Sequence, residues 1–273
     1  MLLTTEQLEA YRADGFLLVP PCFEAAEIAA LKDEAGKEFA VDSERRVLER
    51  NSSVVRSVYG SHVLNEAFQR LVRDPRLLGP AMQVLGDRTY VYQFKVNAKA
   101  AFGGDLWEWH QDYVFWLNED GVPEPNLVNV VVFLDEVTEF NGPMLMVRGS
   151  HREGVIDCRR LADKPEGYEE GPSWIANLTA DLKYSLGKEQ LARLVDKYSL
   201  VSAKGLRGSV LLFHPNLVHG SGQNMSPFDR MISIVTYNRA DNLPRPAAKR
   251  RPWFLVSEDH SPLVPLAGTV SLA

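Results

Sequence analysis

Apolar residues in the first third of the chain recur at the three- and four-residue spacing of amphipathic helices. A capping-box sequence at Thr4-x-x-Gln7 predicts where the first helix begins. Similar patterns cover residues 24–40 and 65–85, the second of them interrupted at Asp74-Pro75. A short apolar run at residues 16–19 is typical of a buried strand.

From about residue 89 the pattern changes to that of β-strands. Residues 90–98 are rich in aromatic and β-branched side chains, and Gln93, Lys95 and Asn97 share one face of this strand. Short strands after a helical first third are typical of a β-sandwich or jelly roll with helices packed outside. Further strands are predicted at residues 127–134, 144–147, 209–213 and 230–237.

Residues 157–203 interrupt this regular pattern. They mix charged residues, glycine and proline with the aromatics Trp174 and Tyr184, and only residues 188–198 have a helical pattern. A long irregular segment inside a domain is more often a lid or binding loop than a second domain. No linker-like composition separates the two halves of the chain. We therefore expect one domain, 1–273, with a mainly helical part over about residues 1–88 and a lid at about 157–203.

Composition narrows the classes of function. The 45% apolar and 24% charged residues are typical of a globular protein with a sizeable core. The net charge of −6 gives no electrostatic footprint for nucleic acid or an anionic membrane. No apolar run approaches the roughly 18 residues of a membrane span. The two cysteines, Cys22 and Cys158, indicate a reducing cytoplasm. The basic run Lys249-Arg250-Arg251 is interpreted as a solvated loop.

The main candidate for chemistry lies in the segment Trp107-Glu108-Trp109-His110-Gln111-Asp112-Tyr113. His110 and Asp112 are two residues apart, so in an extended segment their side chains leave the same face. An imidazole and a carboxylate form two-thirds of a 2-His-1-carboxylate triad for Fe(II). The third ligand predicted is His219, in a distant loop. A lone His-x-Asp is weak evidence, because most such pairs are structural.

Other polar residues are placed where they would assist such a metal. Arg230 follows His219 by eleven residues, and its guanidinium suits the far carboxylate of 2-oxoglutarate, to which Ser221 adds a hydroxyl donor. Gln93 and Asn97 would present amides to the same oxo acid, beside Lys95. Two alternatives remain open from the residues alone: Arg230 as a surface ion-pair partner of Asp229, and a solvated face for the polar residues of the 90–98 strand.

The remaining histidines have simpler interpretations. His151 follows Gly149-Ser150 in a turn and is predicted to be a structural hydrogen-bonding residue. His214 is a weaker candidate for the metal ligand of its segment. His62 and His260 are predicted to lie at the surface.

Taken together, these motifs resemble the phytanoyl-CoA dioxygenase family of Fe(II)/2-oxoglutarate oxygenases, and within it most resemble ectoine hydroxylases. The resemblance covers about residues 6–242. The matching motifs are Asp14-Gly15-Phe16, Tyr92-Gln93-Phe94-Lys95-Val96-Asn97, Trp109-His110-Gln111-Asp112, Trp116, Glu119-Asp120-Gly121-Val122-Pro123, Asn141-Gly142-Pro143, Gly149-Ser150-His151, and His219-Gly220-Ser221 through Arg230 to Tyr237-Asn238.

The resemblance implies a mainly β fold with flanking helices around a double-stranded β-helix, the jelly-roll core also found in cupins. It implies that His110, Asp112 and His219 are iron ligands. It also implies that Gln93, Asn97, Ser221 and Arg230 hold 2-oxoglutarate. On the substrate side we name Lys95, Trp116, Trp174 and Asn238 as candidates.

The sequence departs from the ectoine hydroxylase pattern after Asp112. Those enzymes usually have Trp-His-Ser-Asp-Phe-Glu-Thr-Trp-His, whereas the acidic position here is Val114 and the second histidine position is Leu117. These changes predict a more apolar pocket and argue against ectoine as the substrate.

The expected activity is hydroxylation of an unactivated C–H bond in a small amino-acid-like or natural-product molecule. Fe(II) is the cofactor, 2-oxoglutarate and O2 are cosubstrates, and succinate and CO2 are released. The enzymatic alternative is desaturation, cyclisation or multistep oxidation with the same cofactors. The non-enzymatic alternative is a metal-free, cupin-type binding protein. We expect a monomer or homodimer with no nucleic-acid or membrane partner.

Overall fold

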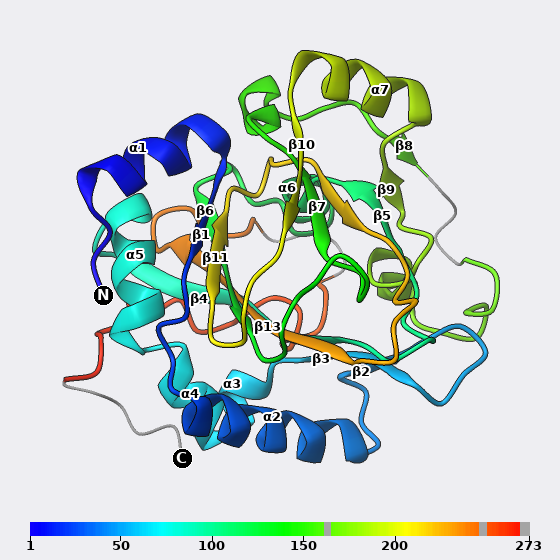
Figure 1. Cartoon of the computed structure of the whole chain (residues 1–273), viewed down its shortest axis with the longest axis horizontal. Coiled ribbons are helices and arrows are strands. Elements are labelled where there is room, and N and C mark those ends of the chain that lie inside the picture. The colour runs from blue at the N-terminus through cyan, green and yellow to red at the C-terminus, as the bar shows by residue number, and fades with distance from the viewer. Residues whose placement is uncertain (161–164, 246–249, 268–273) are drawn as a thin grey trace.

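Two antiparallel sheets that face each other form the centre of the molecule (Figure 1). The computed structural model describes residues 1–160, 165–245 and 250–267. The larger sheet has seven strands in the order β1-β11-β6-β13-β4-β3-β2, and the smaller has four in the order β10-β7-β12-β5. This arrangement is the double-stranded β-helix that the sequence predicts.

The strands of the larger sheet come from both halves of the chain. They are β1 (Phe16–Val19), β2 (Arg46–Leu48), β3 (Val55–Tyr59), β4 (Thr89–Lys99), β6 (Leu127–Phe133), β11 (Val210–Phe213) and β13 (Arg230–Arg239).

The smaller sheet carries the shorter strands. They are β5 (Trp107–His110), β7 (Met144–Val147), β10 (Leu200–Ala203) and β12 (His219–Ser221). A separate pair, β8 (Arg159–Arg160) and β9 (Tyr184–Ser185), lies in the 157–203 segment.

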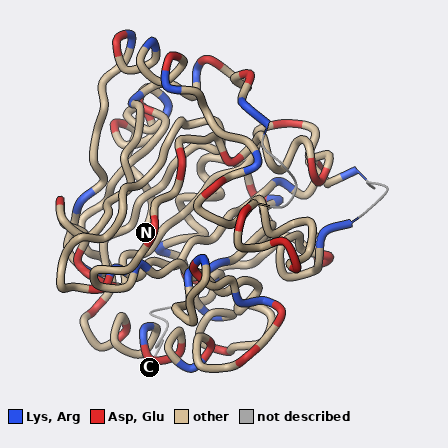
Figure 2. The backbone as a smooth tube through the Cα atoms, turned by 90° about the vertical axis from the view of Figure 1, so that its right-hand side faces the viewer, with Lys and Arg blue, Asp and Glu red and all other residues tan. Residues whose placement is uncertain are grey.

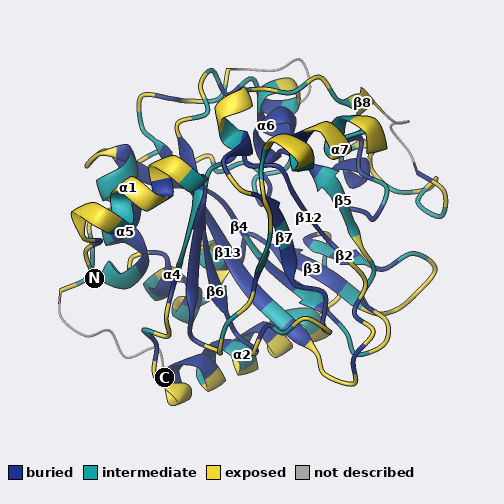
Figure 3. Ribbon diagram, turned by 45° about the horizontal axis from the view of Figure 1, so that its top comes forward, coloured by how far each residue is buried: buried dark blue, intermediate teal, exposed yellow. Residues whose placement is uncertain are grey.

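Helices cover the outer face of the larger sheet. The helices of the chain are α1 (Thr5–Asp14), α2 (Ala25–Ala40), α3 (Ser61–Leu64), α4 (Glu66–Leu71), α5 (Pro75–Leu85), α6 (Asp112–Asp120) and α7 (Lys188–Lys197), with 3-10 turns η1 (Ser150–Glu153) and η2 (Ser173–Asn177). In Figure 3 the central strands are mostly buried, whereas α1, α2 and α7 each expose one face. The helix α7 lies at the end of the molecule away from α2 (Figure 1).

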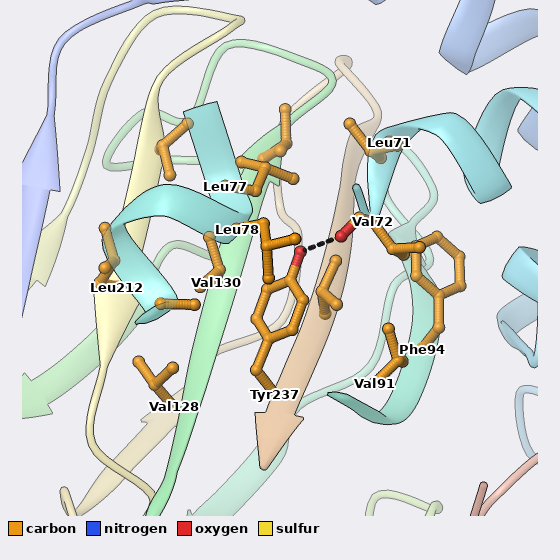
Figure 4. Close-up of a cluster of buried hydrophobic side chains, with 14 of the residues drawn as sticks. Leu71, Val72, Leu77, Leu78, Val91, Phe94, Val128, Val130, Leu212 and Tyr237 are labelled. Carbon is orange, nitrogen blue, oxygen red and sulfur yellow. Dashed lines mark hydrogen bonds between the residues drawn. The ribbon is translucent and has the colours of Figure 1, made fainter. Parts of the chain in front are cut away.

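Alternation along the strands separates two apolar layers. Val128, Val130 and Val132 of β6 pack with helical residues such as Leu77 and Leu78 (Figure 4). Tyr237 of β13 joins this layer, and its hydroxyl donates to the Val72 carbonyl at 2.7 Å. Each fully buried aliphatic side chain in such a layer contributes roughly 1.5–3 kcal/mol to stability.

The opposite faces of the same strands point between the two sheets. Val131 and Phe133 of β6 pack there with Ile232 and Ile234 of β13 and with Met146 of β7. Because β6 is covered on both faces, its sequence is almost continuously apolar. The polar side chains predicted on one face of β4 (Gln93, Lys95 and Asn97) also project into the space between the sheets.

Most of the predicted elements are confirmed. The capping box of α1 is present, and the predicted break at Asp74-Pro75 separates α4 from α5, with Asp74 as the N-cap of α5. The elements β2, β3 and α6 were not predicted. Among the described residues, no helix has the length and apolar character needed to cross a bilayer. Lys and Arg are interspersed with Asp and Glu along the backbone (Figure 2).

Candidate active site

The three predicted metal ligands converge between the sheets. His110 is the last residue of β5, His219 is the first of β12, and the two are directly paired in the antiparallel register. Asp112 is the first residue of α6. Its Oδ1 lies 3.5 Å from His110 Nε2, and its Oδ2 lies 3.9 Å from His219 Nε2. All three side chains are buried.

The backbone conformation that brings His110 and Asp112 together differs from the one predicted. They do not share an extended segment, because the chain turns at Gln111 and α6 begins at Asp112. The Gln111 amide fixes this turn by donating to the carbonyls of Asn216 and Gly154 at 2.7 and 2.8 Å. The aromatic and β-branched residues after Asp112 gave no helical signal, which is why α6 was missed.

Backbone carbonyls orient both imidazoles. The Nδ1 of His110 lies 2.6 Å from the Glu108 carbonyl, and the Nδ1 of His219 lies 2.9 Å from the Leu217 carbonyl. A carbonyl can only accept, so each Nδ1 carries a proton, and in the neutral ring Nε2 presents the lone pair that can bind a metal. Burial and the neighbouring His110 lower the pKa of His219 to about 4, so its ring is neutral near pH 7.

The carboxylate of Asp112 is supported from the larger sheet. Asn129 of β6 donates from Nδ2 to Asp112 Oδ2 at 2.8 Å, and Thr236 Oγ1 donates to Asn129 Oδ1 at 2.7 Å. Burial raises the pKa of Asp112, but the neighbouring Lys95 and His219 outweigh it, and the pKa falls well below its usual range. The sequence analysis missed Asn129, although it is the one polar residue in the apolar run of β6.

These donors fit Fe(II). Two imidazole nitrogens and one carboxylate oxygen lie within 4.8 Å of one another. This is the donor set of the 2-His-1-carboxylate triad, which leaves coordination positions open for other ligands.

Arg230 is buried beside the metal site. It is 3% exposed, donates from Nη2 to the Gly142 carbonyl at 2.6 Å, and leaves Nε without a hydrogen-bond partner. Burial and the nearby Arg56 lower its pKa to about 10, so it still carries its charge near pH 7. The alternative of a surface pair with Asp229 is wrong, because Asp229 instead accepts from the Ala101 amide at 2.8 Å.

The polar face of β4 lines the cavity that also contains the triad and Arg230. Gln93, Lys95 and Asn97 all border it, as does Ser221 of β12. The alternative of a solvated face is wrong, because Gln93 and Asn97 are only 4% and 7% exposed. Gln93 donates to the Leu255 carbonyl at 2.7 Å, whereas Asn97 Oδ1 has no partner. Burial lowers the pKa of Lys95.

The substrate-side candidates divide into two groups. Lys95 and Trp116 line the cavity, where Trp116 packs edge-on against Tyr92 at 5.3 Å between ring centroids. Trp174 and Asn238 do not line it. Trp174 packs against Phe254 at 5.6 Å, and the Asn238 amide donates to the Tyr90 hydroxyl and the Asn242 carbonyl.

Several cavity residues were not anticipated from the sequence. Tyr59, Phe115, Asn177 and Arg251 all contribute to its wall. Val114 and Leu117, by which the apolar pocket was predicted, do not line this cavity, and Phe115 between them does.

Arg251 does not fit the interpretation of its basic run as a solvated loop, although Arg250 is exposed. Its side chain is 6% exposed, and Nε donates to Asp120 Oδ1 at 2.8 Å. Asp120 also accepts from the Tyr92 hydroxyl. Lys249 of that run lies outside the described residues. No local sequence pattern separates Arg251 from an exposed arginine.

The other histidines of the described residues lie outside the triad. His151 approaches the Arg12 carbonyl at 3.0 Å, as predicted for a structural residue, and His214 Nδ1 accepts from the Asn216 amide. His62 is more buried than predicted: it packs against Phe94, and burial lowers its pKa to about 4. His260 is partly buried and packs against Tyr90.

Comparison with known proteins agrees with this geometry. The family model of phytanoyl-CoA dioxygenase (PhyH) matches residues 11–232. The chain is 39% identical over 259 residues to L-proline trans-4-hydroxylase of Streptomyces griseoviridis, covering 94% of this chain and 93% of the relative. It is 35% identical over 263 residues to ectoine dioxygenase of Halomonas elongata, covering 94% and 77%.

A solved structure gives the same picture. The structure of EctD from S. alaskensis with 2-oxoglutarate and 5-hydroxyectoine superposes with a TM-score of 0.81 at 30% identity, covering 99% of this chain and 89% of that one. The chain therefore belongs to the phytanoyl-CoA dioxygenase family, and it is an Fe(II)- and 2-oxoglutarate-dependent hydroxylase.

Proposed function

We propose that this enzyme hydroxylates a ring carbon of a small cyclic amino acid of the proline type. The observation that carries the proposal is a cavity beside the triad that combines apolar walls with the cationic side chain of Arg251. A small aliphatic ring with one carboxylate has this chemistry. The 39% identity to a proline hydroxylase over nearly its whole length supports the same class.

The cavity has two ends with different linings. His219 packs against Phe213 at 4.9 Å between ring centroids, and Phe213 belongs to one apolar cluster with Ile232, two residues from Arg230 on β13. His110 packs against Phe115 at 6.0 Å, toward the side chains of Trp116 and Leu182. We assign the first end to 2-oxoglutarate and the second to the amino acid, so the triad lies between them.

Each end has an anchor for a carboxylate. Arg230 is placed to bind the far carboxylate of 2-oxoglutarate through its unpartnered Nε, and we assign Ser221, Asn97 and Gln93, which line the same cavity, to the rest of the oxo acid. Arg251, held by Asp120, is placed to bind the carboxylate of the amino acid.

The iron, when bound, supplies the oxidation of the C–H bond at the expense of 2-oxoglutarate and O2. The protein decides which C–H bond is presented. Phe115 and Trp116 are placed to hold the aliphatic ring against the triad and to exclude water from it. The relatives described above are named for hydroxylation and dioxygenation, which favours a hydroxylated product over desaturation, cyclisation or multistep oxidation. The metal-free binding protein is not favoured, because the ligand set is complete.

The test is a substrate panel with purified, iron-loaded enzyme. L-Proline, L-pipecolate, ectoine and an acyl-CoA are each incubated with 2-oxoglutarate, and succinate and oxygenated product are both quantified. We expect coupled turnover with one or both cyclic α-amino acids. Coupled turnover with ectoine alone, or with the acyl-CoA alone, would overturn the proposal.

We further propose that residues 1–273 act as one domain, in which about 1–88 form the helical part and about 157–203 form a lid. The lid is supported by Asn177, Leu178 and Leu182, which border the cavity. Limited proteolysis tests it: cleavage within this segment should slow when substrate is bound, and equal rates would contradict a lid. We also propose a cytoplasmic monomer or homodimer, which agrees with the two free cysteines.

A further inference from the structure

Asn177 is a buried amide without hydrogen bonds. It is 6% exposed, and neither Oδ1 nor Nδ2 has a partner. Leaving a buried polar group without a hydrogen bond costs about 1–3 kcal/mol of stability, so folded proteins rarely contain such a group without a functional cause. Asn177 also lines the cavity beside the triad. These two observations together indicate that the partner of this amide is a bound molecule.

The backbone on both sides of Asn177 is held in place. The Ala176 carbonyl accepts from the Lys183 amide at 2.9 Å, and the Leu178 carbonyl accepts from Arg56 Nε at 3.2 Å. Arg56 is fully buried and forms an ion pair with Glu49 at 2.9 Å. The unpartnered amide therefore projects from an anchored turn rather than from a loose loop.

The surroundings of Asn177 belong to the end of the cavity assigned to the amino acid. Leu178, the next residue, packs in one cluster with Tyr59 and Phe254. Phe254 is three residues from Arg251 in the chain, and both Tyr59 and Arg251 border the cavity. On this basis we assign Asn177 to the same end of the cavity as Arg251.

We propose that Asn177 determines substrate specificity by forming two hydrogen bonds to the α-ammonium and α-carboxylate of the amino acid. An asparagine amide has one acceptor oxygen and one donor NH2 group side by side. A free α-amino acid presents the complementary pair, with donors on nitrogen and acceptors on the adjacent carboxylate. The second carboxylate oxygen is left for Arg251. This inference rests on the proposed function and adds the group of the substrate that is recognised.

The experiment compares wild type with Asn177→Asp and Asn177→Leu, using L-proline and L-prolinamide. Asn177→Asp keeps an acceptor for the ammonium but repels the carboxylate, so it should penalise L-proline more than L-prolinamide. We expect KM for L-proline to rise about 10- to 100-fold, as for the loss of a hydrogen bond to a charged group. The ratio of kcat/KM for L-prolinamide to that for L-proline should rise at least about tenfold by the same reasoning.

Asn177→Leu removes both bonds without leaving a buried unpaired amide. It should also raise KM for L-proline, while the melting temperature of the substrate-free enzyme should not fall. The affinities for Fe(II) and 2-oxoglutarate should stay at wild-type values in both variants. Asn118→Asp introduces the same chemical change on the exposed surface of α6 and should leave the substrate ratio unaltered.

The outcomes separate the two proposals. If wild type turns over cyclic amino acids but Asn177→Asp leaves the amide-to-acid ratio unchanged, Asn177 is not a specificity residue and the proposed function stands. A fall in melting temperature of Asn177→Leu with unaltered KM would assign it a structural role instead. If wild type oxidises neither amino acid, the proposed function fails and this inference fails with it.

Discussion

His110 and His219 face each other across the antiparallel pair of β5 and β12, with their ring centroids 4.2 Å apart. Each presents Nε2 to the same space, so removal of either should abolish iron binding and turnover. His151→Ala and His214→Ala should retain the metal, because their rings lie together elsewhere, 5.2 Å apart. Metal analysis of the four purified variants checks this. Equal iron contents in all four would exclude the triad.

Asn129 and Thr236 hold the carboxylate of Asp112 in place from the larger sheet. Loss of such an outer partner typically costs 10- to 100-fold in metal affinity or activity. We expect Asn129→Val to weaken Fe(II) binding within about that range while keeping the fold, because the rest of β6 is apolar. Titration with Fe(II) under anaerobic conditions gives the affinity. The exposed Asn118→Val serves as control, and an equal affinity in both variants would contradict the role of Asn129.

The buried Arg230 should be required for 2-oxoglutarate more than for iron. A hydrogen bond to a charged group contributes about 1.5–3 kcal/mol, so Arg230→Ala should weaken 2-oxoglutarate binding at least about tenfold. Arg230→Lys should recover part of the affinity, since it restores the charge without the planar fork. Arg239→Ala, at the exposed end of the same strand, is the matched control. Unchanged 2-oxoglutarate affinity in Arg230→Ala would transfer this role to another cation such as Lys95.

Lys99 gives a prediction for pH dependence. It is 1% exposed, and burial together with Arg230 and Arg56 lowers its pKa to about 6. Its two acceptors, the carbonyls of Asp105 and Gly222, match the two donors of a neutral amine. Between about pH 6 and 10 the unfolded chain binds this proton and the folded one does not, so this group makes stability rise with pH.

Lys99→Met removes that contribution. The free energy of unfolding of wild type, minus that of the variant, should therefore increase from pH 6.5 to pH 9. Urea denaturation of both proteins at the two pH values measures the difference, and titrations common to both cancel. A difference that is constant or decreases with pH would mean that Lys99 remains charged in the folded protein.

Local patterns predicted the framework well, because the strands that carry the site obey simple rules. Alternation along β4 places Gln93, Lys95 and Asn97 on one face, and burial of both faces makes β6 continuously apolar. The spacing of residues alone did not predict the metal-binding triad. His-x-Asp became informative only with the motifs that follow it, and the helix that begins at Asp112 was not predicted.

The residues missed are those whose position depends on distant segments. Arg251 enters the cavity because the chain after β13 returns to Asp120. The residues next to Arg251 in the sequence do not predict this position. Within residues 157–203 the sequence favoured the aromatic Trp174 as a substrate residue, yet Asn177 three residues later borders the cavity. Asn238 matched a family motif but is satisfied by Tyr90 and Asn242. Tertiary contacts, not local pattern, decide such assignments.

The most direct test of the central claim is the fate of labelled dioxygen. Iron-loaded enzyme is incubated with L-proline, 2-oxoglutarate and oxygen-18 gas, and the products are analysed by mass spectrometry. We expect a hydroxylated amino acid that gains one labelled oxygen atom, formed together with succinate in equal amounts, and neither product with His219→Ala. The contradicting result would be a rate of succinate formation that does not change when L-proline or L-pipecolate is added, together with no labelled amino acid.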